Sequence, residues 1–433
     1  MKIPYLSSIQ RVTLWTSIAL ISLQFASSQA SAQSPVPAAV EAAPETAPKL
    51  TLKEQMEDWR VTPTLDVRTR YEYANQGGRR PAHSGTVRTR AGLLTKEIEG
   101  FQAFIEYEGT LAADRNSYQA ASVHGLGRNR SIIADPESHE LNQLWGSYTY
   151  QDLLKIKAGR QGFILDNQRY VGTVAWRQNM QTFDSATLTL TPFEDFTFFY
   201  GYIWQVNRIF GSGSPTVAGQ TDFEGNSHLF QASYSGLPFG TLTAYAYLFD
   251  LHNLAGDANS NQSYGIHLTG KTGDKLVLAY LLEYALQTDA FDSPLNYTAH
   301  YFHGNLKGSL DIWSLGVGYE WLGSDNGVGY NFPLGTNHAF NGFADVFLAT
   351  PGTGLQDIYI SAGVKLPMGF QFSTWYHKFY SSNGNINYGD GFDAVLTKDL
   401  GKGFSFLAKL GYYDANKFAV NTTRFTAEIN YKF

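Results

Sequence analysis

Apolar and polar side chains alternate with a period of two along most of the chain, from about Arg60 to the last residue, Phe433. The segment 65–73 reads LDVRTRYEY and the segment 425–433 reads FTAEINYKF, each with one apolar and one polar face. A two-residue period is the geometry of a β-strand, because successive side chains of a strand point to opposite faces of the sheet. The pattern therefore predicts an all-β chain whose strands each meet two different environments.

Strands of this kind form either a soluble β-sandwich or a closed antiparallel β-barrel in a membrane. The connections favour the barrel, because short turns alternate with longer Gly-, Asn- and Asp-rich stretches, as in outer-membrane barrels with both termini in the periplasm. We expect about 18 strands, since roughly 21 residues per strand and connection fits strands of ~9–11 residues. The short turns are predicted near 97–100, 151–152, 192–195, 236–240, 272–274, 307–311, 367–369 and 400–403, and the longer stretches include 111–137, 164–180, 208–226 and 324–355.

Composition and the C-terminus agree with a barrel of the bacterial outer membrane. Aromatic residues make up 15% of the chain and charged residues only 16%, which suits interfacial girdles and lipid-facing strands. The apolar face of segment 425–433 ends on Phe433. Such an end resembles the signal by which outer-membrane proteins are handed to their assembly machinery. We therefore expect that machinery as a partner through Phe433, and outer-membrane lipid and lipopolysaccharide around the barrel.

The first 32 residues have the features of a secretory signal. Lys2 and Arg11 precede an apolar run over 12–26, and residues 30–32 form a small-residue cleavage motif, Ala-Ser-Ala. A membrane-anchor helix is the alternative, but the run is short and a Pro-rich stretch follows it. The sequence predicts a signal peptide over 1–32, a flexible periplasmic linker over 33–58 and a barrel over 59–433. Without Lys2 and Arg11 the net charge changes from −6 to −8, so nucleic acid is not an expected partner.

Arginine is concentrated in the first part of the barrel, where thirteen of the sixteen arginines lie between residues 60 and 177. A charge on the lipid face costs about 2–4 kcal/mol near the middle of the membrane, so these side chains are expected to face the lumen. By the alternation rule the inward residues include Arg68, Arg70, Arg88, Arg90, Glu106, Lys155 and Lys157.

Two interpretations of this basic lining remain open. The arginines can pair with Glu72, Glu106 and Glu108 of the same wall and simply fill the barrel. They can also form a cationic track for an anionic solute, because the guanidinium group keeps its charge and binds carboxylate in a bidentate manner. Several moderately attractive sites pass a charged solute better than one tight site, so acidic neighbours are compatible with transport.

One segment carries a family resemblance. Residues 154–184 read LKIKAGRQGFILDNQRYVGTVAWRQNMQTFD. The motifs GRQ (159–161), DNQR (166–169), VG (171–172), WRQN (176–179) and QTFD (181–184) resemble the alginate-export family of outer-membrane β-barrels. The resemblance implies an 18-stranded barrel, and an arginine-rich lumen through which the type member exports an acidic polysaccharide.

The loop 164–180 within this segment is rich in charged and aromatic residues. We expect it to fold into the lumen, where Arg160, Asp166, Arg169 and Arg177 would form a charged constriction. The alternative is an internal salt-bridge lattice that only fixes the loop in position.

Other functions have weaker support in the sequence. His300 and His303 would point to opposite faces of one strand, and neither they nor His377 belong to a recognisable catalytic group, so we do not expect an enzyme. We expect no cofactor, although the loops 256–262 and 384–393 have a composition that could hold structural calcium.

The sequence thus predicts an outer-membrane channel for passive export or uptake of anionic poly- or oligosaccharides. Arg68, Arg70, Arg88, Arg90, Arg160, Arg169 and Arg177 would provide selectivity, modulated by Asp166 and Glu106. One alternative is a diffusion porin for small nutrients. Another is a plugged barrel that acts as a surface adhesin or receptor.

Overall fold

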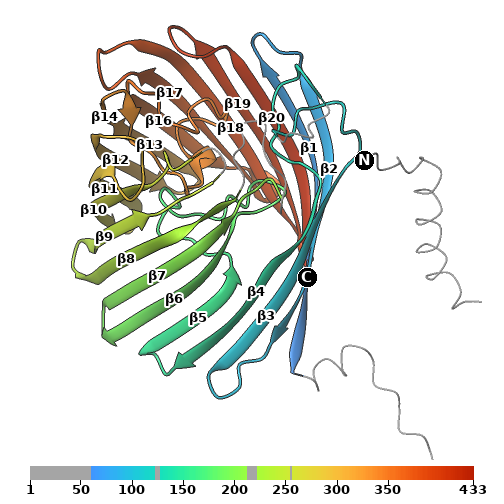
Figure 1. Cartoon of the computed structure of the whole chain (residues 1–433). Helices are drawn as coiled ribbons and strands as arrows, with labels where there is room; N and C mark the ends of the chain where they lie inside the picture. Colours follow the sequence, from blue (N-terminus) through green and yellow to red (C-terminus); the bar gives the residue numbers. More distant parts are fainter. Residues whose placement is uncertain (1–59, 122–126, 212–221, 254–255) are drawn as a thin grey trace, which may run out of the picture. The chain divides into compact units, whose positions relative to one another are not determined.

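The computed structural model describes residues 60–121, 127–211, 222–253 and 256–433. They form one antiparallel sheet of eighteen strands. The first strand, β1 (Val61–Gln76), pairs with both β2 (Ala82–Thr95) and β20 (Thr422–Lys432), so the sheet closes into a barrel. Figure 1 shows the strands following each other around the barrel in chain order. The predicted fold class is confirmed, whereas the predicted signal peptide and linker lie outside the described residues.

The remaining barrel strands, except β5 with its 8 residues, are long enough to cross an outer membrane with tilt. They are β3 (Phe101–Ala112), β4 (Ser138–Tyr150), β5 (Leu154–Gln161), β6 (Thr182–Phe193), β7 (Phe196–Asn207), β8 (Phe223–Leu237), β9 (Gly240–Phe249), β10 (Asn261–Thr272), β11 (Leu276–Asp289), β12 (Thr298–Leu310), β13 (Trp313–Leu322), β16 (Leu355–Lys365), β17 (Phe370–Tyr380), β18 (Asn387–Gly401) and β19 (Phe404–Ala415). A separate two-stranded hairpin, β14 (Ser324–Asp325) with β15 (Val328–Gly329), and two short 3-10 turns, η1 (Asn337–Ala339) and η2 (Pro367–Gly369), lie in connections.

The connections alternate in length as predicted. Eight short turns join β2 to β3, β4 to β5, and so on to β18 and β19, each at or next to a predicted position. Residues with positive φ make several of these turns, for example Asp195, Asp311 and the pair Lys402–Gly403. The longer loops occupy the opposite rim, which is the extracellular side of an outer-membrane barrel.

The outer face of the barrel carries the apolar half of each strand. Leu93, Ile105 and Leu144 are neighbours across β2, β3 and β4, and all three are exposed. Toward the extracellular rim, four hairpins repeat one outward pair in which a Tyr hydroxyl hydrogen-bonds a His Nδ1. The pairs are Tyr71 with His83 (2.7 Å), Tyr107 with His139 (2.7 Å), Tyr200 with His228 (2.9 Å) and Tyr284 with His300 (2.8 Å). Amphipathic rings at one level are typical of a membrane–water interface.

The C-terminal residue closes the barrel against β1. Leu65 N donates to Phe433 O at 3.2 Å, and Phe433 N donates to Leu65 O at 2.8 Å. The Phe433 side chain itself is exposed. Recognition of Phe433 by the assembly machinery stays a prediction. No helix in the described ranges is both long and apolar enough to cross a membrane.

Two long loops fold into the barrel, the 162–181 loop after β5 and the 323–354 loop after β13. They join each other through a parallel bridge between Val171 and Leu334. Gly172 N donates to Leu334 O at 3.0 Å, and Thr336 N donates to Gln168 O at 2.9 Å. The inward fold predicted for the first loop is therefore present, and a second loop that was not predicted supports it.

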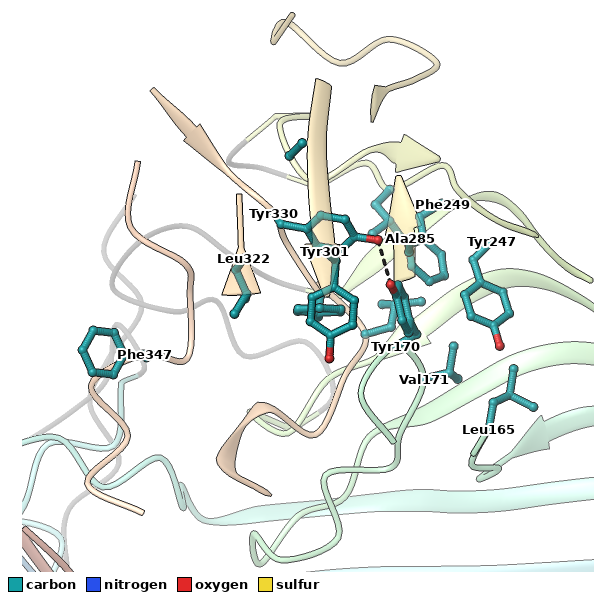
Figure 2. Close-up of a cluster of buried hydrophobic side chains, with 14 of the residues drawn as sticks. Leu165, Tyr170, Val171, Tyr247, Phe249, Ala285, Tyr301, Leu322, Tyr330 and Phe347 are labelled. Atoms are coloured by element: carbon teal, nitrogen blue, oxygen red, sulfur yellow. Dashed lines mark hydrogen bonds between the residues drawn. The ribbon is translucent and has the colours of Figure 1, made fainter. Parts of the chain in front are cut away.

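A buried aromatic cluster anchors both loops to the barrel wall (Figure 2). Tyr170 of the first loop lies 5.0 Å from Tyr245 of β9 and 4.9 Å from Phe332 of the second loop, measured between ring centroids. Its hydroxyl hydrogen-bonds that of Tyr330 at 2.7 Å. Each large apolar side chain buried in this way contributes roughly 1.5–3 kcal/mol, so the loops are integral parts of the fold.

Close approach of the second loop to β19 requires a glycine. A Cβ on Gly411 would lie 2.4 Å from the carbonyl carbon of Phe343, too close for any side chain. The loop can therefore lie directly on the wall at this point. Arg424 of β20 holds the next residue, donating from Nε to Ala344 O at 3.0 Å.

Candidate functional site: the lining of the barrel

The predicted arginines of β1 and β2 face the interior. Arg70, Arg88 and Arg90 are buried and Arg68 is nearly so. They lie in phase with Asp66 and Glu72 on the inner face, while Val67 and Tyr71 point outward. This wall, with β3 and β20, is called the basic half below.

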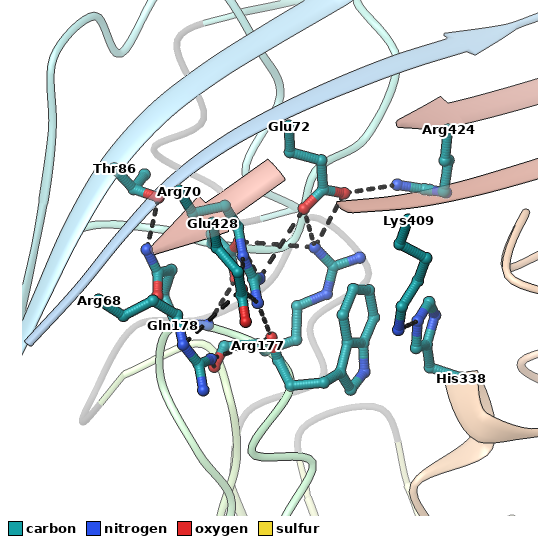
Figure 3. A network of polar contacts seen from close by, with 12 residues as sticks. Arg68, Arg70, Glu72, Thr86, Arg177, Gln178, His338, Lys409, Arg424 and Glu428 are labelled. Atoms are coloured by element: carbon teal, nitrogen blue, oxygen red, sulfur yellow. Dashed lines mark hydrogen bonds and ion pairs between the residues drawn. The ribbon is translucent and has the colours of Figure 1, made fainter. Parts of the chain in front are cut away.

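Side chains of the basic half contact the tip of the 162–181 loop (Figure 3). Arg68 Nη1 donates to the carbonyl oxygens of Ala175 and Trp176 at 3.0 and 3.2 Å. Arg70 pairs with Glu428 of β20 at 2.7 Å and with Asp135 at 3.3 Å. Arginine suits this position because its five donors can serve carbonyls and carboxylates at once.

Arg177, at that loop tip, is the centre of a buried ion network. Its Nη1 lies 3.0 Å from Glu72 and 3.6 Å from Asp135, and its Nη2 lies 3.1 Å from Asp345 of the 323–354 loop. Arg424 also pairs with Glu72, at 3.2 Å. Burial alone would lower the pKa of Arg177, but the three carboxylates raise it above its usual value. Asp135 belongs to the loop between β3 and β4, so the network joins the barrel wall, both inward loops and this third loop.

On β2, the guanidinium groups of Arg88 and Arg90 have N–H donors without a hydrogen-bond partner in the described part of the chain. Arg88 contacts Asp66 and donates to Asn430 at 3.3 Å, and Arg90 contacts Glu108. Within the described ranges, Arg88 Nε and Nη1 and Arg90 Nη2 have no hydrogen-bond partner. Cationic groups outnumber carboxylates by two in the network, which comprises Arg68, Arg70, Arg88, Arg90, Arg177, Lys409, Arg424 and Lys432 with Asp66, Glu72, Glu108, Asp135, Asp345 and Glu428.

His338 of the 323–354 loop is a neutral link in this network. Its Nδ1 donates to Asp345 at 2.5 Å, and its Nε2 accepts from the Lys409 ammonium at 2.9 Å. The Trp176 ring stacks on it with centroids 3.3 Å apart. Burial lowers the pKa of His338 to about 3, and the cations Lys409 and Arg177 act in the same direction against the pull of Asp345.

We predict that the barrel loses stability as the pH falls from about 6.5 toward 3. The unfolded chain protonates His338 in this window while the folded chain does not, so His338 alone gives a slope of up to about 1.4 kcal/mol per pH unit. The check is the unfolding temperature of the detergent-solubilised barrel at several pH values. His338→Gln is expected to flatten the slope, and an unchanged slope in that variant would contradict the assignment.

Arg169 and Asp166 lie elsewhere in the lumen and do not meet Arg177. Arg169 Nε lies 2.9 Å from Glu320 of β13, and its guanidinium stacks on Phe332 and Phe340 at 4.1 and 4.4 Å. Asp166 accepts from Gln231 of β8 at 2.5 Å. Arg169, Arg177 and Asp166 therefore lie in three different places and form no single constriction, and the lattice interpretation describes Arg169 and Arg177 well.

The lumenal position predicted for Arg160 is wrong. Its register partners are Leu144 of β4 and Asp184 of β6, and Leu144 belongs to the outer face. Arg160 pairs there with Asp184 in a bidentate manner, at 2.7 and 2.9 Å. The physical reason is strand phase, because Arg160 lies an even number of residues from the outward Leu154 and Ile156.

Lys155, Lys157 and Glu106 have the predicted inward orientation. Lys157 Nζ lies 4.0 Å from the centroid of the Trp145 ring, and Lys155 is exposed near the periplasmic end of β5. Glu106 accepts from Asn142 and Gln143 at 2.7 and 3.0 Å. Glu106 is thus held by neutral amides, whereas the two lysines extend the basic lining toward the periplasm.

The opposite wall holds a row of ionisable residues that the sequence did not reveal. Neighbouring strands β10 to β16 contribute one member each, paired directly across the sheet: His267, Glu283, His303, Glu320 and Asp357. His377 and Asp393 extend this acidic half onto β17 and β18. Each of these residues lies between outward-facing neighbours, so the alternation of the sequence indicates that it faces inward. The register that aligns these residues across the strands could not be predicted from the sequence.

Two cavities lie along this acidic half. One of about 480 Å³ lies beside the first inward loop and is lined by Asp166, His267 and Glu283 among others. The other is smaller and lies under the second loop. A larger concavity of about 790 Å³ between β11 and β18 is apolar and faces lipid. In the part of the chain that the structure describes, no group of three His, Cys, Asp or Glu residues could hold a metal ion.

Comparison with known proteins identifies the family. The family model for alginate export matches residues 60–288, which is more than half of the chain. A comparison with curated protein sequences finds no match.

Solved structures share the fold. OccK9 (OpdG) of Pseudomonas aeruginosa has a TM-score of 0.67 and 13% identity, with 87% of this chain and 99% of that chain covered. OccAB4 of Acinetobacter baumannii has a TM-score of 0.66 and 12% identity, with 86% and 98% covered. OccK2 (OpdF) of Pseudomonas aeruginosa, solved in complex with glucuronate, has a TM-score of 0.65 and 13% identity, with 86% and 96% covered. By its barrel and its family match, the chain belongs to the alginate-export family and is a channel of the bacterial outer membrane.

Proposed function

We propose that this channel passes anionic oligo- or polysaccharides passively, with uronate carboxylates moving along the basic half of the lumen. The observation that carries the proposal is the set of inward guanidinium groups on β1 and β2, whose donors are not all used. Arg68, Arg88 and Arg90 contact Glu428, Asp66 and Glu108, yet N–H groups of Arg88 and Arg90 have no partner in the described chain. These donors are buried in the described arrangement, so a passing carboxylate accepts from them where neighbouring side chains move aside.

The acidic neighbours keep this interaction weak, which transport requires. Each arginine already shares its charge with a carboxylate, so a passing uronate exchanges one partner for another instead of being trapped. Lys155 and Lys157 provide further cations toward the periplasmic end. The glucuronate bound to OccK2 gives an example of such a solute in a barrel of this fold.

The test is inhibition of ion current by oligouronates in a planar bilayer. Oligouronates are expected to interrupt the current at concentrations at least tenfold below those at which neutral oligosaccharides of equal length do so. The neutral oligosaccharides control for the effect of solute size on the current. Equal effects of the two series would leave a diffusion porin without preference for uronates.

A plugged receptor is the second candidate, because both inward loops pack closely in the lumen through the Tyr170 cluster. That function predicts no ion current from correctly folded protein. We also propose that lipopolysaccharide surrounds the outer girdle and that the assembly machinery recognises Phe433. Removal of Phe433 is then expected to lower the amount of assembled barrel in the outer membrane.

A further inference from the structure

A small pocket of about 150 Å³ lies under the 323–354 loop, on the acidic half of the lumen. Residues 339–343 of the loop form one side, and strands β12, β13 and β16 to β18 form the other. Ala339 is exposed and Phe340 and Phe343 are half-buried, so the pocket opens beside the loop. The polar side chains used below are Glu320, Asp357, His377 and Asp393.

The pocket carries excess negative charge. Glu320 is balanced by Arg169 at 2.9 Å and also accepts from Tyr301 at 2.7 Å. Asp357 and Asp393 share a single histidine, His377, at 2.9 and 3.5 Å. One negative charge remains if His377 is protonated, and two remain if it is neutral. A further cation, Lys409, acts on Asp393 through space but hydrogen-bonds His338. Among the described residues only His377 makes an ion pair with either carboxylate, and a buried carboxylate without a contacting countercharge is costly, so the pocket favours a cation.

Asp393 supplies a hydrogen-bond acceptor, its Oδ1 atom, that has no partner among the described residues. Its side chain is 3% exposed. Oδ2 accepts from Phe343 N at 2.9 Å, whereas Oδ1 is buried and has no partner among the described residues. Leaving a buried acceptor unsatisfied costs free energy. A donor entering the pocket would recover this free energy.

The remaining walls are aromatic. Trp375, Tyr359, Phe340 and Phe343 line the pocket, and the rings of Phe343 and Trp375 meet edge to face at 5.6 Å. Ring faces attract organic cations. A hard metal ion such as Ca²⁺ would instead require six to eight oxygen ligands, and no metal-binding group occurs among the described residues.

We propose that this pocket binds the primary ammonium group of a solute, R–NH₃⁺. Asp393 Oδ1 accepts one N–H, and the faces of the aromatic walls, Trp375 among them, surround the charge. The site goes beyond the uronate function, because it lies on the opposite half of the lumen and uses none of the basic-half arginines. A solute with both an amine and a carboxylate could contact both halves.

The experiment is a ligand-observed saturation-transfer NMR titration of the full chain in detergent, which requires no ion current. The probes are D-glucosamine, kept protonated by mildly acidic buffer, and N-acetyl-D-glucosamine, its neutral counterpart. Saturable binding of glucosamine is expected, with an affinity at least tenfold above that of the N-acetyl sugar. Equal binding of the two sugars, or none by glucosamine, would overturn the proposal without bearing on the uronate test.

Two matched variants locate the site. Asp393→Asn keeps the shape and removes the charge, and it is expected to weaken glucosamine binding at least tenfold. Asp390→Asn makes the same change on the same strand, but Asp390 pairs with Lys378 at 2.8 Å outside the pocket, so binding should not change. Unchanged binding in a folded Asp393→Asn variant would overturn the assignment. If that variant does not fold, the two sugars decide the matter on the unaltered chain.

Discussion

Arg177→Ala is expected to release both inward loops and to raise the single-channel conductance several-fold. Removing this guanidinium leaves Glu72, Asp135 and Asp345 without their shared partner in a buried place. Breaking a buried ion network by removing one partner costs about 3–5 kcal/mol. Arg70 still contacts Glu72 and Asp135, and Arg424 still contacts Glu72 and Asp345, but these two cations then face three carboxylates, and Arg70 also pairs with Glu428. The measurements are conductance in a planar bilayer and the unfolding temperature in detergent.

Arg160→Ala is the matched control for that prediction. It also removes one arginine and breaks a bidentate ion pair, but the pair with Asp184 lies on the outer face near the extracellular rim. The pair lies outside the network that ties the loops to the wall, so conductance should not change, and the unfolding temperature should fall less than in Arg177→Ala. Equal conductance of the Arg177→Ala and Arg160→Ala proteins would mean that the network does not hold the loops in the lumen.

The barrel could be predicted from the sequence because its determinants are local. Alternation with a period of two defines each strand, and the sorting of short and long connections defines the topology. Both features can be recognised in the sequence without knowing which strands are neighbours in the sheet. Even the inward fold of the 162–181 loop followed from its own charge and aromatic content.

The lining was less predictable because it depends on register and loop path. His267 and Asp357 lie at the same level only because four cross-strand registers align them, and sequence alone leaves register open. Arg169 and Arg177 lie in one loop, yet the loop directs them to opposite walls. No motif was recognised in the sequence of the 323–354 loop, although this loop contributes Asp345 and His338 to the buried ion network.

The outward orientation of Arg160 could have been predicted from the sequence. Its phase relative to Leu154 and Ile156 already indicates the outer face, whereas the prediction grouped it with the charged residues of the adjacent loop. A motif identifies relatives, whereas alternation gives the direction of a side chain. In a barrel the second criterion decides whether a charge can line the lumen.

Replacing Arg68, Arg88 and Arg90 together by Gln is expected to abolish the anion preference of the channel and to make it cation-selective. The variant keeps Asp66, Glu108 and Glu428, so the basic half becomes net negative. Charges within a Debye length, about 8 Å at physiological salt, act directly on a passing ion. The triple Lys variant is the control, because it keeps the charges and should keep the sign of selectivity.

The reversal potential of the unaltered channel in a potassium chloride gradient shows directly whether the lumen prefers anions or cations. The basic half predicts a potential with the sign of chloride preference, and the triple Gln variant predicts the opposite sign. A cation-selective potential in the unaltered channel would contradict a lumen that guides anionic saccharides.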